Sequence, residues 1–322
     1  MRSVLVWCDG SVHAAPSDAQ LTKAVQDPQS LVWLDLEGEP HQHDDELRKR
    51  FKVSPLTLEI VAEQTQRAKL AQGEKYTHLV VHGLAFDPAT VQGHLPELDI
   101  IFGPNFLITV HTEPLAWLKD LGQAAKRDGT ALQHGVAFLL HAVLDTLVDS
   151  YFPVLDQIDD LVDDLENQTV RGNDAVQGSI FRVKRTLALM RRVISPQVEV
   201  FNSLMIRSDD VIPAEARPYF ADVHDHLVRA FEILDSYRDL MSGLLDVYLS
   251  TVSNRLNVIM KQLTIYAAIF FPITFITGIF GQNFGHSPQV DHDGGYNFWI
   301  VLGIMALIVA GQVAYFRWKR WI

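Results

Sequence analysis

Near its carboxyl end the sequence places polar and small side chains at helical spacing in a stretch with very little charge. The members of this face lie three or four residues apart: Asn257, Met260, Leu263, Ala267, Phe271, Thr274 and Gly278. Residues with that spacing share one side of a helix. In a membrane, hydroxyl and amide groups usually face a helix interior or a water-filled path, whereas small residues also permit close helix packing. The face is therefore either a packing surface or the wall of an ion path.

The surrounding sequence favours the ion path. An uncharged run from 262 to 285 is long enough to cross a hydrocarbon core of about 30 Å at about 1.5 Å per helical residue. Upstream, apolar residues keep the same spacing from Phe220 to Leu263, so we expect one helix of about 60 residues that ends near Phe280. Such a helix cannot bury its apolar stripe within one small domain. Self-association around a common axis would cover the stripe.

A second uncharged run, 296–316, predicts a second membrane span. The loop before it follows Gly281, Gln282 and Asn283, contains no Lys or Arg, and holds four residues able to bind a metal ion: His286, Asp291, His292 and Asp293. Basic residues lie outside the two spans, at Arg255, at Lys261 and in the segment 317–320. This distribution predicts that both chain ends lie in the cytoplasm and that the protein crosses the cell inner or plasma membrane twice.

The rest of the chain has the composition of a water-soluble protein. The 322 residues have a mean hydropathy of only +0.08 and a net charge of −12, so only the C-terminal part is apolar enough to insert into a membrane. The single cysteine, Cys8, excludes an intramolecular disulfide. An acidic chain without a long basic run also argues against nucleic acid as a partner.

Residues 1–130 predict a mixed α/β domain. Short apolar, β-branched-rich runs predict strands at 3–7, 31–36, 77–82, 98–102 and 106–110. Helical spacing predicts helices at 18–26, 44–51 and 55–63, with caps at Ser17, Asp44 and Ser54. We therefore expect an α+β cytoplasmic domain with a small sheet flanked by helices, followed by long stalk helices over 131–261. A two-helix transmembrane hairpin over 262–322, with spans at about 262–280 and 296–316, would complete an oligomeric funnel.

Two stalk helices of opposite charge are separated by a break at 171–173. The first carries six carboxylates within about three turns: Asp156, Asp159, Asp160, Asp163, Asp164 and Glu166. This run is either an ordinary solvated face or a surface that attracts cations. The second helix is basic, so we expect the two to pair as an antiparallel hairpin.

No catalytic constellation is present in the sequence. It has neither a Gly-rich phosphate loop nor a Gly-x-Ser-x-Gly elbow, which argues against an enzyme. Two histidine pairs, His41-x-His43 and His224-x-His226, could suggest metal binding. On a helix, residues two apart point about 200° from each other, so His224 and His226 cannot share one ion.

Two runs in and just after the first span form a specific pattern. They read Asn254-x-x-Asn257-x-x-Met260-Lys261-x-Leu263-Thr264 and Ile269-Phe270-Phe271-Pro272-x-Thr274-x-Ile276-Thr277-Gly278-x-Phe280-Gly281-Gln282-Asn283-Phe284. This pattern closely resembles the signature of the CorA family of divalent-cation transporters. Weaker similarity at 33–36, 66–70 and 106–111 extends the resemblance over nearly the whole chain. The resemblance implies a homopentamer with a pore lined by the first span, which passes magnesium, often cobalt or nickel, or zinc in one branch.

The resemblance also implies roles for single residues. Gly281, Gln282 and Asn283 would form the extracellular pore mouth. Asn257 and Thr274 would form polar rings, and Leu263 and Phe271 apolar constrictions. Family members bind regulatory divalent cations between cytoplasmic domains, and the candidates here are Asp222, Asp225 and Asp246. An amide and carbonyl mouth can hold hydrated magnesium through its waters, and apolar rings can close a pore by dewetting.

The sequence leaves ion identity open, because Gln282 stands where Met is commonest in the family. The leading interpretation is a channel or transporter for magnesium, with cobalt or nickel, that needs no cofactor beyond the transported or regulatory cations. Its partners would be further copies of the chain and membrane lipid. A zinc transporter, coupled to protons or not, is the nearest alternative, because His286 and His292 lie beside the mouth. In a different class, the chain could be a membrane-tethered receptor or assembly module.

Overall fold

The computed structural model describes residues 1–64, 67–173, 175–207, 212–281 and 295–321. The chain divides into two units, Met1–Leu245 and Asp246–Ile322, and each is described by itself. We call them unit 1 and unit 2. The sequence-based divisions at residues 130 and 261 are not tested by this split and stay predictions.

Unit 1 is built on a seven-stranded sheet in the order β2-β1-β3-β9-β8-β5-β4. The strands are β1 (Arg2–Cys8), β2 (Ser11–Ala14), β3 (Leu31–Glu37), β4 (Lys69–Gln72), β5 (Thr77–His82), β8 (Glu97–Phe102) and β9 (Phe106–His111). Strands β3 and β9 pair in parallel, and the other neighbours are antiparallel. The five predicted strands are confirmed as β1, β3, β5, β8 and β9. Strands β2 and β4 and a separate ribbon of β6 (Ala85–Asp87) and β7 (Gln92–His94) were not predicted, because three or four largely exposed residues leave no hydrophobic period.

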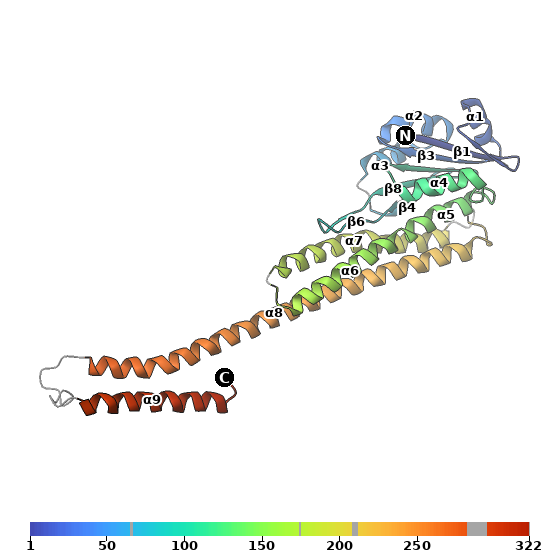
Figure 1. Cartoon of the computed structure of the whole chain (residues 1–322). Helices are drawn as coiled ribbons and strands as arrows, with labels where there is room; N and C mark the ends of the chain where they lie inside the picture. Colours follow the sequence, from blue (N-terminus) through green and yellow to red (C-terminus); the bar gives the residue numbers. More distant parts are fainter. Residues whose placement is uncertain (65–66, 174, 208–211, 282–294, 322) are drawn as a thin grey trace. The chain divides into compact units, whose positions relative to one another are not determined.

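Three short helices cover one face of the sheet (Figure 1). They are α1 (Asp18–Gln26), α2 (Asp44–Arg50), which follows the 3-10 turn η1 (Pro40–His43), and α3 (Pro55–Glu63). Leu21, Leu47 and Leu58 of these helices pack with strand residues such as Val32 and Leu34 in one buried cluster. The predicted caps Ser17 and Ser54 are confirmed, since each accepts a backbone N–H of the first turn. The cap predicted at Asp44 is wrong: His43 is the cap, and Asp44 is the first helical residue.

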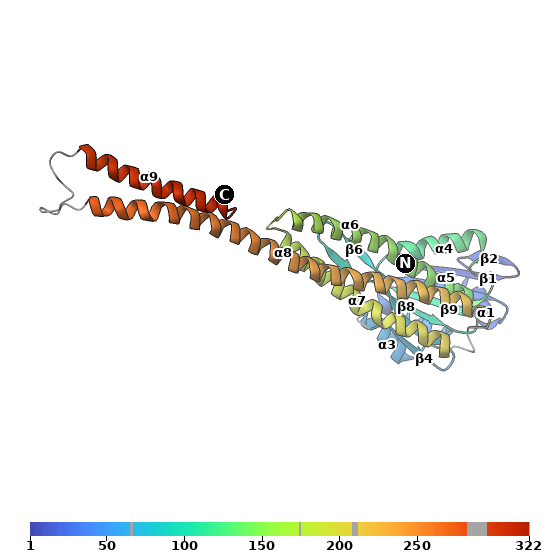
Figure 2. The same ribbon diagram turned by 90° about the horizontal axis from the view of Figure 1, so that it is seen from below.

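Longer helices form the other layer of unit 1 (Figures 1 and 2). They are α4 (Ala116–Asp128), α5 (Val136–Asp149), α6 (Tyr151–Val170), α7 (Val176–Arg207) and the first part of α8 (Arg217–Phe280). The Tyr151 hydroxyl donates to the carbonyl of His82 on β5, and the His82 N–H donates to Gln197 Oε1 at 2.9 Å. These buried hydrogen bonds tie α6 and α7 to the sheet. The stripe of α8 is buried in this unit at Phe220, Val223, Leu227, Ala230, Leu234 and Met241.

Unit 2 contains the remainder of α8 and a final helix, α9 (Gly295–Trp318). The predicted long helix is confirmed as α8, which runs for 64 residues and ends at Phe280 as expected. In Figures 1 and 2, α9 lies alongside the C-terminal part of α8. Apolar side chains are exposed on both helices, including Phe270, Phe275 and Leu307 at 63%, 62% and 75%.

By length and composition, three helical segments of the described residues could cross a membrane. They are Val136–Val170, Arg217–Phe280 and Phe298–Trp318. Half of the apolar window in the first segment is buried within the protein, against 6% and 0% in the other two. The first segment is therefore a core element of unit 1, whereas the other two present apolar surface that water does not favour.

Candidate functional site

The predicted face of α8 is exposed along its course through unit 2. The side chains of Met260, Leu263 and Phe271 are 58%, 59% and 76% exposed. The remaining members, Asn257, Ala267, Thr274 and Gly278, are exposed as well. The described part of unit 2 therefore leaves this face uncovered.

The opposite side of α8 is the side that α9 covers. Ile265 is only 8% exposed, and its neighbours on this side are partly buried: Lys261, Ala268, Ile269, Pro272, Ile273 and Ile276. At about 100° per residue, Leu263 and Ala267 lie roughly 160° around the helix from Ile265. Gln312 of α9 donates from Nε2 to the Ala268 carbonyl at 2.8 Å, on the covered side. The pairing with α9 thus leaves the predicted face free for water or for another copy of the chain.

The hydroxyl groups of this part of α8 are oriented in a way that suits a cation. Thr274 donates its proton to the Phe270 carbonyl at 2.8 Å, and Thr264 donates to the Met260 carbonyl at 2.7 Å. Because the proton is used within the helix, the oxygen lone pairs remain as acceptors. Repeated around an axis, the face would alternate polar rings with apolar constrictions.

Of the predicted pore mouth, only Gly281 lies within the described residues. Its N–H donates to the Thr277 carbonyl at 2.8 Å, so it closes the last turn of α8. A Cβ at this position would lie 3.1 Å from that same carbonyl oxygen, which is tighter than ordinary contact. The other predicted residues of the mouth and loop lie outside the described part of the chain: Gln282, Asn283, His286, Asp291, His292 and Asp293.

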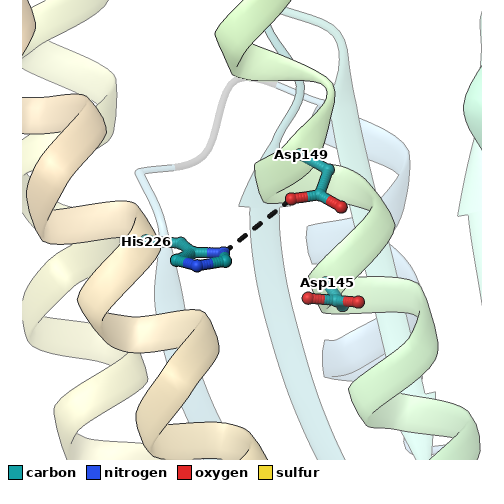
Figure 3. A group of neighbouring side chains, drawn as sticks. All are labelled: Asp145, Asp149 and His226. Atoms are coloured by element: carbon teal, nitrogen blue, oxygen red, sulfur yellow. Dashed lines mark ion pairs between the residues drawn. The ribbon is translucent and has the colours of Figure 1, made fainter.

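Unit 1 contains a second candidate site, where α5 and α8 bring three metal-binding side chains together (Figure 3). Asp145 and Asp149 lie one turn apart on α5, and His226 faces them from α8. Their ligand atoms all lie within 4.8 Å of one another. His226 Nδ1 is 3.8 Å from Asp149 Oδ1. Two carboxylates and one imidazole match the ligands that zinc, cobalt and nickel accept, whereas magnesium prefers oxygen ligands alone.

The electrostatics of this cluster are compatible with a bound cation. Burial raises the pKa of the Asp145 carboxyl; His141 and His226 act against this shift, and the negative charges of Asp149 and Asp222 add to it. Burial also lowers the pKa of His141, which favours its neutral form. A divalent ion would relieve the repulsion between the carboxylates and displace the proton that burial favours on Asp145.

Among the described residues, the three carboxylates predicted as regulatory ligands form no metal-ligand group of their own. Asp222 lies close enough to influence the pKa of Asp145. Asp225 instead lies 3.5 Å from His224, and Asp246 belongs to unit 2. Regulatory metal roles for these residues stay predictions.

Sequence reasoning missed Asp145 and Asp149. The signal was present as two carboxylates at i and i+4 on one helix, but that spacing is also common on solvated faces. The expectation that His224 and His226 cannot share an ion agrees with the structure. His226 faces Asp149 of α5, whereas His224 Nδ1 lies 3.5 Å from Asp225 Oδ1.

The acidic run of α6 is exposed at all six carboxylates. Burial raises the pKa of Tyr237 on α8, and the hydrogen bond and negative charge of Asp159 raise it further. The tyrosine therefore stays neutral and adds no negative charge to the run.

Comparison with known proteins places this architecture in one class. The CorA-like Mg2+ transporter protein family matches residues 28–320. The cobalt/magnesium transport protein CorA of Thermotoga maritima is 33% identical over 312 residues, which cover 95% of this chain and 88% of that protein. The structure of the CorA magnesium transporter from Methanocaldococcus jannaschii has the same fold, with a TM-score of 0.85 at 21% identity, and the match covers 100% of this chain and 99% of that one. More distantly, the zinc transport protein ZntB of Yersinia enterocolitica is 23% identical over 300 residues, which cover 92% of this chain and 90% of that protein.

The family match over residues 28–320, together with the shared fold, identifies a membrane transporter of divalent cations. The chain belongs to the CorA family, as the resemblance in the sequence indicated.

We expect the Asp145–Asp149–His226 cluster to bind cobalt in the full-length protein. Cobalt should raise the midpoint of thermal unfolding at pH 7.5, because a ligand at 100 times its Kd stabilises the folded state by about 2.7 kcal/mol. The double variant Asp145→Asn/Asp149→Asn should lose most of this rise. Asp164→Asn, which removes an exposed charge on α6, serves as the matched control and should keep it. An equal rise in all three proteins would contradict the prediction.

The cobalt effect should also depend on pH. A raised folded-state pKa means that Asp145 takes up a proton more readily in the folded than in the unfolded protein. Without metal, this group therefore lowers the free energy of unfolding as the pH rises from the pKa of Asp145 in the unfolded state through its raised pKa in the folded state. Metal requires the deprotonated carboxylate, so the cobalt-induced rise in unfolding midpoint should shrink as the pH falls from 7.5 toward the raised pKa of Asp145. A cobalt effect that stays constant down to the ordinary pKa of an aspartate, about 3.9, would exclude Asp145 as a ligand.

Proposed function

We propose that the chain assembles into a homo-oligomer, with five copies, that conducts divalent cations across a cell membrane down their electrochemical gradient. The exposed face of α8 would line the pore, and both chain ends would lie in the cytoplasm. On this proposal the protein is a channel and not an enzyme. The observation that carries it is the pairing of α8 with α9, which covers one side of the helix and leaves the mixed polar and apolar side exposed.

Self-association is the natural way to cover that face. Two helices offer no interior in which polar residues of the span such as Thr274 could avoid lipid, and polar groups facing hydrocarbon are costly. Around a closed axis the same residues would face a shared path containing water. Phe271 and Leu263 would then form the narrow apolar positions that open or close by wetting.

Magnesium, with cobalt, is the proposed cargo. Support comes from the Thermotoga maritima relative, whose name gives cobalt and magnesium. Zinc is the second candidate, because a relative is named as a zinc transporter and because the loop sequence contains His286 and His292. Zinc accepts imidazole nitrogen readily, whereas magnesium seldom does.

The cluster of unit 1 is proposed to regulate conduction. His226 belongs to α8, the helix that also carries the proposed pore face, so a cation held by Asp145, Asp149 and His226 would favour one position of that helix. A bound cation shifts such an equilibrium only by its difference in affinity for the two states. High cytoplasmic cation would thus favour the state that binds it.

Flux into liposomes tests the pore. Wild-type protein should admit magnesium or cobalt, and Asn283→Ala should lower the rate at least tenfold, because the mouth would lose its amide oxygen. Asn202→Ala, on an exposed position of α7, is the control and should conduct normally. No uptake of magnesium, cobalt, nickel or zinc by the wild type would overturn the proposal. Normal conduction by Asn283→Ala would favour a path for the cation that avoids Asn283. Wild-type protein that binds divalent cations without conducting them would favour the receptor or assembly module.

Two exposed aromatic residues of α8 distinguish the proposed pore face from another side of the helix. Phe271 is 76% exposed and lies in the face, whereas Tyr266 is 61% exposed and lies about 140° around the helix from it. We expect Phe271→Ala to raise the resting flux several-fold, because a smaller side chain admits water more easily. Tyr266→Ala should leave the flux within about twofold of wild type. Equal effects of the two changes would show that the face does not line the path.

Ion competition addresses the choice of cation. Magnesium flux should be inhibited by cobalt and nickel at lower concentrations than by zinc if magnesium is the cargo. Zinc that outcompetes the others, with a rate that follows the proton gradient, would favour the zinc alternative. In the variant Gln282→Met, the order in which the competing cations inhibit magnesium flux should change only if this position contacts the ion or its water shell.

A further inference from the structure

Pro272 interrupts the hydrogen bonding of α8 beside the proposed pore face. Proline has no backbone N–H, so the carbonyl four residues earlier, that of Ala268, loses its helical partner. In hydrocarbon no water replaces that bond, and an unsatisfied carbonyl is costly. The carbonyl therefore needs a donor from elsewhere in the protein.

Gln312 supplies that donor from α9. Its Nε2 lies 2.8 Å from the Ala268 carbonyl oxygen, although the two residues are 44 positions apart in the sequence. Gln312 is partly buried in an otherwise apolar stretch of α9. Its Oε1 has no hydrogen-bond partner among the described residues. The amide is thus used as a donor, and the freed carbonyl explains why an amide occurs in this span.

We infer that Gln312 is a positioning residue for the pore helix, and this inference rests on the proposed function only where it concerns flux. The bond joins α9 to α8 at the one turn whose own hydrogen bonding is broken by a proline. Ala268 and Pro272 lie on the covered side of this turn, and Phe271, on its exposed side, is 76% exposed. By satisfying the carbonyl, Gln312 fixes how α8 passes Pro272 and hence the direction of Phe271 and Thr274.

A thermodynamic cycle in the full-length protein tests the bond. The four proteins are wild type, Gln312→Leu, Pro272→Ala and the double variant. In the wild-type background, Gln312→Leu should shift the unfolding equilibrium in detergent by about threefold to twentyfold, the range of hydrogen bonds between membrane helices. In the Pro272→Ala background the same change should have a much smaller effect, because position 272 then donates a backbone N–H of its own to the Ala268 carbonyl. Equal effects in the two backgrounds would overturn the inference.

A second variant tests the donor directly and does not require Pro272→Ala to fold. In Gln312→Glu, the protonated carboxyl can donate to Ala268, whereas the carboxylate cannot. Relative to wild type at each pH, this variant should therefore approach wild-type stability at low pH and lose it as the pH rises. The variant Gln312→Leu should show a constant deficit over the same range. A constant deficit in Gln312→Glu as well would assign Gln312 to packing alone and overturn the inference.

Flux separates this inference from the proposed function. Gln312→Leu should change the maximal rate of cobalt uptake by at least threefold and leave the half-saturating cobalt concentration unchanged, because the mouth keeps its oxygen atoms. If wild-type protein does not conduct, the proposed function fails, yet the stability cycle still decides whether Gln312 supports the helix at Pro272. If wild-type protein conducts and Gln312→Leu matches it in stability and rate, the positioning role fails while the pore remains.

Discussion

The contact between α8 and α9 determines what the rest of unit 2 can do. Ile265, with 8% exposure, marks the covered side, and one amide hydrogen bond joins the helices across it. Within the described part of unit 2 each of these helices packs only against the other, so the rest of the α8 surface there lies open. Some of this surface is simply apolar and suits lipid. The part that contains Thr274 does not, because the hydroxyl oxygen keeps lone pairs for donors that hydrocarbon lacks. This imbalance between the two open sides is the physical reason for expecting a shared axis.

The charge distribution of unit 1 is compatible with this picture. Carboxylates are exposed along α6. A separate pair on α5, Asp145 and Asp149, faces His226 of α8. A cluster of like charges costs free energy until a counter-ion arrives, and burial of Asp145 increases that cost. We therefore expect the cluster to respond to divalent cations in a way that isolated surface carboxylates do not. His226 and Phe271 are both residues of α8, so the cluster and the proposed pore face belong to one continuous helix.

Sequence reasoning was strongest where a single periodic pattern determined the structure. The central strands of the sheet and the whole of α8 were predicted because their apolar spacing is long and regular. Short edge strands such as β2 were missed, because pairing with β1 rather than their own composition places them in the sheet. The cluster of Asp145, Asp149 and His226 was missed for a related reason. Its members lie about 80 positions apart in sequence, and only the packing of α5 on α8 brings them together.

The proline of the membrane helix shows how a sequence pattern can be right and still incomplete. Pro272 was noted as part of a family signature, and Gln312 was counted only as one residue of an uncharged run. A polar residue in a membrane span is usually assigned a function of its own. Here the geometry assigns it to another residue's backbone: Gln312 donates to the carbonyl that Pro272 leaves without a partner. That bond also fixes which side of α9 faces α8, so the remaining sides of α9 are those available to lipid or to another copy of the chain. A proline in one span and a lone amide in the next are thus two parts of a single structural requirement.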